Sequence, residues 1–315
     1  ATNPCVTGDT VILTDKGYKE IETLVNQQVN VWNGYEWSPV KVKLTGRNQE
    51  IKDVYFSDGS KLSCTPYHKF VLKDGERVQA TSLEVGDQLV KHDFPVIQGE
   101  KSLSTKTAYT QGFYSGDGDA GVGKKRKRIW LYDQKTDLLD FLNVHTVSDQ
   151  SVGNYRLMVT VQGNLREKTF VPSARYSVQT RLDWLAGLLD SDGSIQDGAF
   201  TIWSVEHDFL KKVKYLLNTL GVSGTVSLAT EAGTKRMPDG KGGTKVYPTK
   251  ECYRITINKF SAAKLVALGL NTHRVVHDAE APPSRSAARF ITVTNIVDRD
   301  ELEDSVYCFN EKKNH

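Results

Sequence analysis

A chain of 315 residues is longer than one hydrophobic core usually supports, so its length predicts two domains. Hydrophobic residues make up 38% and charged residues 25%, which is typical of a globular protein, and no apolar run approaches the roughly 18 residues of a membrane-spanning helix. The net charge is only +3, but residues 101–280 hold 25 Lys and Arg against 18 Asp and Glu. This asymmetry predicts that a polyanion binds the middle of the chain.

The cysteines and the first residues bear on the cellular compartment. Four cysteines without a Cys-x-x-Cys pair favour neither a zinc site nor a disulfide framework. The sequence starts without a cationic stretch leading into an apolar one, which would mark a secretory leader. We therefore expect an intracellular, cytoplasmic protein.

Residues 5–96 contain many short runs that are rich in β-branched and aromatic residues. Residues 40–44 alternate apolar and charged side chains, as a half-buried strand does. Asn33-Gly34 and Asp58-Gly59 are typical turn pairs between such runs. The pattern predicts an all-β domain.

Three residues in this part form a chemical motif. Residues 5–10 read Cys-Val-Thr-Gly-Asp-Thr, and Thr65 stands three residues before His68. Together they resemble the splicing domain of inteins, the horseshoe-shaped Hint fold that hedgehog autoprocessing domains share. The resemblance implies that the Cys5 thiol attacks the preceding carbonyl and exchanges an amide for a thioester, with Thr65 and His68 activating that peptide bond. A histidine titrates near neutral pH, which suits protonation of the leaving nitrogen.

Two related motifs follow in the middle of the chain. Residues 185–193 read Leu-Ala-Gly-Leu-Leu-Asp-Ser-Asp-Gly, and residues 110–118 read Thr-Gln-Gly-Phe-Tyr-Ser-Gly-Asp-Gly. Small residues on one helix face let a second helix approach closely, and we expect Gly193 to end its helix in a left-handed turn. Asp117 and Asp192 then stand at the negative ends of their helices, where a hard divalent cation would compensate the carboxylates.

The similarity continues beyond the motifs, so the middle of the chain reads as two repeats. Each repeat is predicted to run helix, strand, strand, helix, strand, strand, and the two pair about a pseudo-twofold axis. The second repeat carries extra residues, which we expect to form a flexible loop. The predicted elements are the strand 128–131, helix 137–142 and strand 155–160 in the first repeat, and the strand 201–204, helix 208–220, loop 232–250, strand 253–257 and helix 261–268 in the second.

The repeated motif resembles the LAGLIDADG homing endonucleases, in which two αββαββα units pack through their motif helices and a sheet surface lies on DNA. The resemblance implies that Asp117 and Asp192 bind Mg²⁺ or Mn²⁺ and that the substrate is double-stranded DNA, bound by a monomer. Lys259 ends a predicted strand where the family carries a basic residue near the scissile phosphate. The first repeat lacks a lysine at the corresponding place, so either Lys168 reaches in or the two DNA strands are cut unequally.

Two groups of basic residues are candidates for contacts with DNA phosphates, because phosphate contacts supply most of the affinity of such proteins. The first is a run entering a strand and the second lies in the extra loop. The candidates are Lys124, Lys125, Arg126, Lys127, Arg128, Lys235, Arg236, Lys241 and Lys245.

The end of the sequence returns to strands, at 289–296 and 305–310. It resembles the penultimate sequence block of inteins, with Cys308 in place of the usual acid and His315 as the histidine that assists asparagine cyclisation. The block that should follow, ending in His-Asn, is not in the sequence. Complete splicing by this chain alone is therefore not expected, and the missing strand is either removed or supplied in trans.

The sequence thus predicts a multi-domain protein with two activities: autocatalytic splicing, and metal-dependent double-strand DNA cleavage at the intein-free insertion site. The expected parts are an N-extein remnant at 1–4, an all-β Hint domain at 5–96 and 281–315, and an α+β LAGLIDADG domain at 97–280. The degenerate first motif leaves open an intein with an inactive endonuclease, or a DNA-binding protein on a non-splicing Hint scaffold. Thr-Asn-Pro before Cys5 resembles a segment of the ribonucleotide reductase large subunit, a candidate host.

Overall fold

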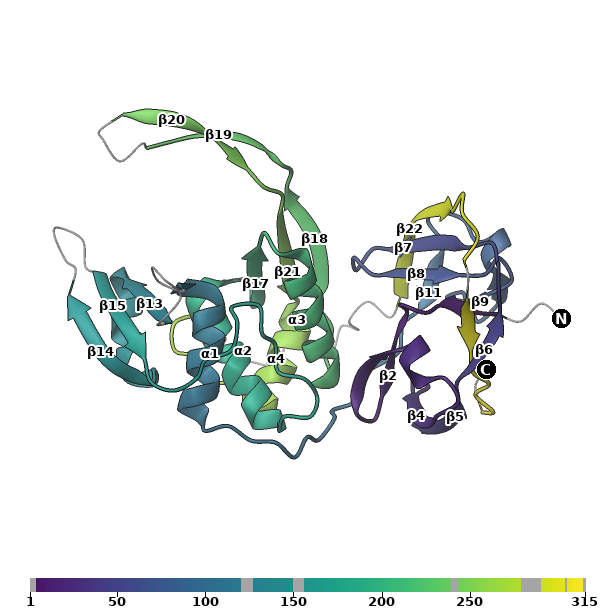
Figure 1. Ribbon diagram of the computed structural model, residues 1–315, viewed down its shortest axis with the longest axis horizontal. Helices are drawn as coiled ribbons and strands as arrows, with labels where there is room; N and C mark the ends of the chain where they lie inside the picture. The colour runs from purple at the N-terminus through teal and green to yellow at the C-terminus, as the bar shows by residue number, and fades with distance from the viewer. Residues whose placement is uncertain are drawn as a thin grey trace. The chain divides into compact units, whose positions relative to one another are not determined.

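The computed structural model describes residues 4–119, 127–149, 156–238, 243–278, 290–303 and 305–313. The chain divides into two compact units, one of residues 1–97 and 284–315 and one of residues 98–283. We call them the β unit and the α+β unit (Figure 1). The sequence placed the boundaries one to three residues away, at 96/97 and 280/281. No helix in the described ranges is long and apolar enough to cross a membrane.

The β unit is built around a seven-stranded antiparallel sheet. Its order is β11-β22-β7-β8-β1-β23-β6, so β1, from the start of the sequence, lies between β8 and the C-terminal β23. This arrangement brings three distant parts of the sequence together at the first residue of β1. The strands are β1 (Val6–Thr7), β6 (Lys43–Gly46), β7 (Lys52–Phe56), β8 (Lys61–Cys64), β11 (Gln88–Val90), β22 (Phe290–Asp298) and β23 (Val306–Cys308).

Two smaller sheets complete the β unit, in the orders β3-β2-β4-β5 and β10-β9. Their strands are β2 (Val11–Thr14), β3 (Gly17–Glu20), β4 (Gln28–Trp32), β5 (Trp37–Lys41), β9 (Lys69–Val71) and β10 (Arg77–Gln79), with 3₁₀ turns η1 (Ile21–Leu24) and η2 (Ala80–Ser82). The predicted glycine turns are present, because Gly34 and Gly59 have φ of 101° and 77°.

The strand predicted at 40–44 is two strands. Val42 is completely buried, and its backbone bonds with Gln27 and Asn26 instead of continuing a ladder. β5 therefore ends at Lys41 in the four-stranded sheet and β6 begins at Lys43 in the seven-stranded sheet. The alternating pattern does not change across this bend, so periodicity alone could not reveal it.

The α+β unit has two antiparallel four-stranded sheets and two central helices, α1 (Thr105–Asp117) and α2 (Val178–Asp192), which lie side by side (Figure 1). One sheet has the order β12-β13-β15-β14 and the other β16-β17-β21-β18, so both repeats have the same strand order. The strands are β12 (Gly118–Asp119), β13 (Arg128–Tyr132), β14 (Val144–Asp149), β15 (Arg156–Val161), β16 (Gly193–Gln196), β17 (Ala199–Ser204), β18 (Thr225–Thr230) and β21 (Cys252–Ile257).

The helices differ between the repeats. The second repeat has α3 (His207–Thr219) and α4 (Lys259–Leu268), close to the predicted helices. The helix predicted at 137–142 is instead a 3₁₀ segment, η4 (Asp133–Phe141), and residues 162–177 form no helix. The segment 133–141 has one buried residue, Leu138, so it lacks the continuous apolar face that stabilises an α-helix.

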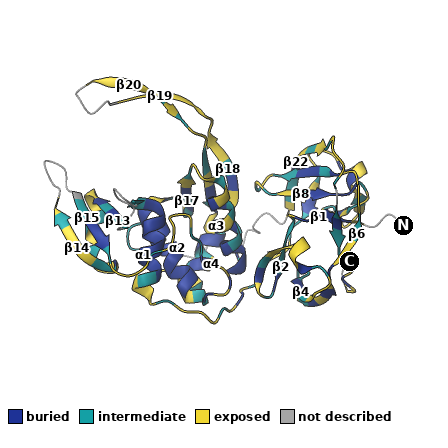
Figure 2. Ribbon diagram, in the orientation of Figure 1, coloured by how far each residue is buried: buried dark blue, intermediate teal, exposed yellow. Residues whose placement is uncertain are grey.

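The loop predicted at 232–250 is largely a β-hairpin of β19 (Gly233–Pro238) and β20 (Thr244–Thr249). In Figure 1 the hairpin extends from the ends of β18 and β21. Figure 2 shows that it is mostly exposed, whereas α1 and α2 are mostly buried. The core of this unit surrounds those two helices and includes Phe113, Trp184 and Phe200, all at most 1% exposed. Burying each such side chain contributes about 1.5–3 kcal/mol.

Candidate functional sites

Cys5 and Thr65 face each other across the pair β1 and β8. The amide N–H of Cys5 donates to the Thr65 hydroxyl at 3.0 Å, and the amide of Thr65 donates to the Cys5 carbonyl at 2.9 Å. Cys5 is buried, whereas Pro4 before it is exposed. The peptide bond between Pro4 and Cys5 therefore stands at the edge of the β unit with its nitrogen held by Thr65.

The sulfur of Cys5 has two polar neighbours. Its Sγ lies 3.0 Å from the Thr45 hydroxyl, and it is hydrogen-bonded to the thiol of Cys308 on β23. The Cys308 hydrogen bond lowers the pKa of Cys5 to about 7, with burial opposing the shift and Thr45 adding to it. The same hydrogen bond raises the pKa of Cys308, as do burial and the charge of the Cys5 thiolate. Cys5 is thus the thiol of the pair that ionises first.

His68 is held close to this site by its backbone. Its N–H donates to the Thr65 carbonyl at 2.9 Å, and its carbonyl accepts from Ala80 at 2.8 Å. The ring packs edge-on against Phe70 at 5.2 Å, and its Nδ1 is buried with no hydrogen-bond partner in the described part of the chain. Burial lowers the pKa of the imidazole to about 4, so His68 is neutral at pH 7.

A third cysteine provides a contrast. Cys64 precedes Thr65 and is fully buried, and burial together with the charge of Asp53 raises the pKa of its thiol to about 12. Cys64 is therefore an inert core residue.

The motif helices of the α+β unit touch backbone to backbone. A Cβ on Gly112 of α1 would lie 1.8 Å from the Trp184 carbonyl oxygen, and one on Gly187 of α2 would lie 2.0 Å from the Tyr109 carbonyl oxygen. Only glycine fits at these two positions. The predicted close approach of two small-residue faces is therefore present.

The same packing brings the two motif acids together. Asp117 and Asp192 are the last residues of α1 and α2. A Cβ on Gly116 would lie 3.0 Å from the Asp192 carboxyl carbon, so the two helix ends adjoin. Burial raises the pKa of Asp117, and the charge of Asp192 raises it further, while Lys135 and Lys168 act in the opposite direction.

Gly118 and Gly193 follow these acids. A left-handed turn was expected at Gly193, but the structure gives a different reason for both glycines. Their φ angles are −78° and −83°, so neither helix ends in a left-handed turn. A Cβ on Gly118 would lie 2.1 Å from the Tyr114 carbonyl oxygen, and one on Gly193 would lie 2.5 Å from that of Leu189. Glycine is required here by steric exclusion.

Two lysines stand at the first acid. Lys135 Nζ lies 2.6 Å from the Asp117 carboxylate, and Lys168 Nζ donates to the Gly118 carbonyl at 3.0 Å. Lys168 was one of two alternatives drawn from the sequence for the first repeat. Lys135 was missed, because it lies in the 3₁₀ segment η4, which no motif marks.

Lys259 is the first residue of α4 and does not end a strand, and its predicted role near the scissile phosphate stays a prediction. In the sheet register Gly193 is level with Ile202 and Ile255, and β21 ends at Ile257, two residues before Lys259. The Lys259 side chain adjoins the turn at Gly198, and its Nζ lies over the Phe260 ring.

Two of the five basic residues at 124–128 make contacts within the first repeat. Lys124, Lys125 and Arg126 lie outside the described residues, as do Lys241 and His315. Lys127 Nζ donates to the Leu165 and Arg166 carbonyls, and Arg128 pairs with Asp119. These two side chains therefore serve the structure of the first repeat.

The basic residues of the hairpin have a different setting. Lys235, Arg236 and Lys245 are exposed, and the register places Lys235 opposite Tyr247 and Lys245 opposite Met237, on one face of the ribbon. Their charges face solvent and are available for contact with an anionic surface.

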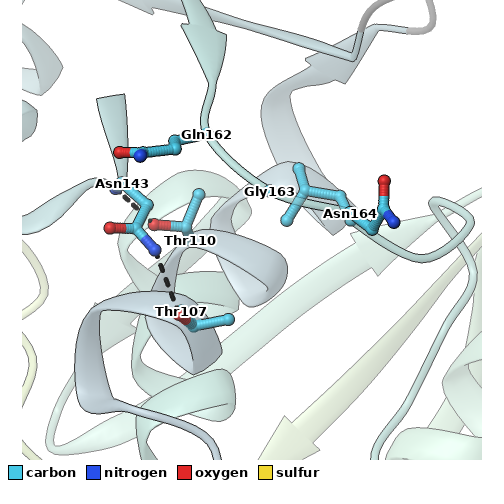
Figure 3. Close-up of a pocket in the computed structure, with 7 residues that line it drawn as sticks. Thr107, Thr110, Asn143, Gln162, Gly163 and Asn164 are labelled. Carbon is cyan, nitrogen blue, oxygen red and sulfur yellow. Dashed lines mark hydrogen bonds between the residues drawn. The ribbon is translucent and has the colours of Figure 1, made fainter. Parts of the chain in front are cut away.

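A pocket of about 340 Å³ lies beside the first half of α1 (Figure 3). Its lining polar groups bond to one another: the Asn143 side chain donates to Thr107 at 3.0 Å and its backbone N–H donates to Thr110 at 2.8 Å. Neither motif acid lines it. We assign it no function.

Residues 179–267 match the family described as LAGLIDADG-like domain. The second repeat is a LAGLIDADG-like domain. The prediction from its motif is confirmed, and the fold prediction of an all-β part and an α+β part is confirmed with it.

Two relatives that align with all or most of the chain are both named as subunits of ribonucleoside-diphosphate reductase. The chain is 34% identical over 336 aligned residues to the ribonucleoside-diphosphate reductase large subunit of Invertebrate iridescent virus 6, covering all of this chain and 34% of that protein. It is 27% identical to the ribonucleoside-diphosphate reductase NrdEB subunit alpha of Bacillus subtilis (strain 168), covering 84% of this chain and 30% of that protein. The chain thus spans about a third of the length of the curated relatives it matches.

Solved structures similar to this chain include an intein and a homing endonuclease. I-DmoI in complex with DNA and Ca is 20% identical, covering 56% of this chain and 95% of its own, with a TM-score of 0.36. A mutant of an Ssp DnaB mini-intein variant is also 20% identical, covering 32% of this chain and 67% of its own, with a TM-score of 0.26.

Proposed function

We propose that the β unit carries out the first step of protein splicing, an N-to-S acyl shift at Cys5. The observation that carries the proposal is the pairing of a nucleophile with its own peptide bond: Cys5 has a thiol whose pKa is about 7, and its amide N–H is held by Thr65. About half of such thiols are ionised at pH 7, which gives a nucleophile without a separate base.

The reaction moves the acyl group of Pro4 from the nitrogen to the sulfur of Cys5. The Cys5 thiolate attacks the Pro4 carbonyl carbon, and a carbon–sulfur bond replaces the carbon–nitrogen bond. The Cys5 nitrogen leaves as an amine and takes up the proton that the Cys5 thiol gives up, and the neutral His68 ring would relay this proton by accepting it before donating it. Thr65 accepts the amide N–H at 3.0 Å and so fixes the orientation of the leaving nitrogen.

The test is thiol-induced cleavage of a reporter fused ahead of Ala1. Incubation with dithiothreitol should release the reporter after Pro4, as followed by intact mass, and release should disappear in Cys5→Ala and His68→Ala. Cys64→Ser is the matched control, because that thiol is inert and should leave release unchanged. Release that persists without Cys5 would exclude the acyl shift.

We further propose that the α+β unit is a homing endonuclease that cuts both strands of an intein-free insertion site, in a ribonucleotide reductase gene. Support comes from the meeting of Asp117 and Asp192 at adjoining helix ends. Both supply carboxylate oxygens, which suit Mg²⁺ or Mn²⁺. The described residues contain no group of three or more His, Cys, Asp or Glu that could hold a metal ion. Asp117 and Asp192 would hold such an ion, which when bound would supply Lewis-acid chemistry at the scissile phosphate.

The outer faces of the two sheets are the proposed DNA surface, bound by a monomer. Ile129 and Leu131 of β13 point into the core and Trp130 outward, and in β17 Ile202 points inward and Trp203 outward. The tryptophans thus occupy matching places in the two repeats, beside strands rich in polar residues. The hairpin lysines and arginine would extend this surface along the phosphates.

The test uses a plasmid carrying the joined flanks of the insertion site in the intein-free host gene. Mg²⁺ or Mn²⁺ should support linearisation by the full chain, and Asp117→Asn and Asp192→Asn should each abolish it. Binding of the same site without cutting by the wild-type chain would identify the alternative, an inactive endonuclease.

A further inference from the structure

Arg274, in the segment after α4, caps the C-terminal end of α2 with its side chain. Its guanidinium donates to the carbonyl oxygens of Gly193 at 2.6 Å and Leu189 at 3.0 Å, and also to those of Asp190 and Ser191. The last carbonyls of a helix have no partner within the helix. One side chain therefore satisfies carbonyl groups on both sides of Asp192.

Asp190 holds Arg274 in this place. Its fully buried carboxylate accepts the backbone N–H groups of His273 at 2.7 Å, Arg274 at 2.9 Å and Val275 at 3.1 Å, and the Tyr109 hydroxyl at 2.8 Å. Tyr109 belongs to α1, which lies beside α2 in Figure 1. The position of Arg274 is thus tied to both motif helices.

The first repeat has a cation at the corresponding carbonyl. Lys168 Nζ donates to the carbonyl of Gly118, which follows Asp117 as Gly193 follows Asp192. Lys168 also comes after the last strand of its repeat, as Arg274 does. The two repeats make the same contact with different residue types.

We propose that Lys168 and Arg274 are positioning residues, each holding the glycine carbonyl next to one motif acid and offsetting the negative end of that helix. The inference rests on the proposed DNA cleavage. The two repeats have the same strand order, and a pseudo-twofold axis between them would match that of a DNA duplex, so each helix end would serve one DNA strand. Arg274 bonds several carbonyls through a rigid fork and Lys168 bonds one, so loss of Arg274 has the larger effect.

The first experiment measures each strand separately. A supercoiled plasmid with the insertion site is cut by wild type, Arg274→Met, Arg274→Lys and Lys168→Met, and end-labelled fragments show which strand is cut. Arg274→Met should slow one strand at least tenfold and leave the other within twofold, so that nicked plasmid accumulates. Lys168→Met should slow the opposite strand, and Arg274→Lys should recover part of the loss.

A general loss of folding would slow both strands equally, because it lowers the amount of active protein. Equal slowing of both strands, or slowing of the same strand by Arg274→Met and Lys168→Met, would overturn the proposal. Lys212→Ala is the matched control, since this exposed lysine lies on α3, away from both helix ends, and should change neither rate.

The second experiment does not need DNA cleavage. The Gly193 N–H donates to the Leu189 carbonyl, so amide hydrogen exchange at Gly193 reports opening of the last turn of α2. Arg274→Met should speed exchange at Gly193 about tenfold and leave Gly118 unchanged, and Lys168→Met should do the reverse. Unchanged exchange would reject the positioning role even if wild type proved unable to cut DNA, and a wild type that does not cut would count only against the proposed function.

Discussion

The amide nitrogen of Cys5 and the hydroxyl oxygen of Thr65 are 3.0 Å apart, and this contact joins residues 60 positions apart in the sequence. Thr65→Val removes the hydroxyl and keeps the volume. A lost hydrogen bond of this kind costs about 1–3 kcal/mol, so thioester formation at Cys5 should slow by roughly 5- to 150-fold. Dithiothreitol-induced release measures the rate. Thr65→Ser keeps the hydroxyl and should stay within a few-fold of wild type, and equal rates for Thr65→Val and wild type would contradict the role of Thr65.

The thiol of Cys308 sets the pH range in which Cys5 reacts. Its hydrogen bond lowers the pKa of Cys5 to about 7, so the thiolate forms as pH rises through 7. Cys308→Ala removes that bond and should raise the pKa of Cys5, which moves the rate profile to higher pH and slows reaction at pH 7. Alkylation of Cys5 by iodoacetamide as a function of pH checks this, with Cys64→Ser as background. Coincident profiles for Cys308→Ala and wild type would refute it.

The buried imidazole of His68 should make the β unit sensitive to acid. Its pKa is about 4 in the folded state and about 6.5 when unfolded, so the unfolded chain binds more protons between these values. Stability is therefore complete above pH 6.5 and falls as pH drops toward 4, by about 3 kcal/mol. Urea unfolding at pH 7 and pH 4.5 measures the loss. His68→Gln cannot titrate and should lose less over the same range, and an equal loss would assign the sensitivity to other groups.

Gly112 and Gly187 permit the contact between α1 and α2. Gly112→Ala places a Cβ 1.8 Å from the Trp184 carbonyl oxygen, which forces the helices apart. The expected loss is about 1–3 kcal/mol of stability, since added volume in a packed core has a cost of this size. Gly233→Ala is the control, because the nearest atom there is 4.0 Å away and the backbone is extended. Thermal unfolding should separate the two variants, and similar melting temperatures would argue against close helix packing.

The exposed basic residues of the β19–β20 hairpin should contribute to DNA affinity through phosphates. A variant with Lys235→Ala, Arg236→Ala and Lys245→Ala removes three charges, so the slope of log affinity against log salt should become shallower by about 3. Fluorescence anisotropy with the insertion-site duplex at several salt concentrations measures the slope. Lys212→Ala should leave it unchanged, and an unchanged slope for the triple variant would show that the hairpin does not touch DNA.

Local patterns in the sequence were sufficient to predict the two chemical motifs and most secondary structure. Apolar and small residues ending in an acid and a glycine predicted α1 and α2 with Asp117 and Asp192 at their ends. Turn glycines and alternating residues predicted the β unit. Such patterns depend on neighbours within a few residues, which is the range over which helix and strand periodicity acts. They failed at Val42 and in η4, where long-range packing decides the local conformation.

The surroundings of the motif residues were decided only by the tertiary structure. Lys135 reaches Asp117 across 18 positions, Arg274 reaches Gly193 across 81, and Cys308 reaches Cys5 across more than 300. No periodicity links such residues, because their distance depends on how sheets and helices pack. The sequence by itself determined which residues are the candidates for the chemistry. The fold decided which cations and hydrogen bonds surround them, and it placed Lys259 at the start of α4, beside the turn at Gly198.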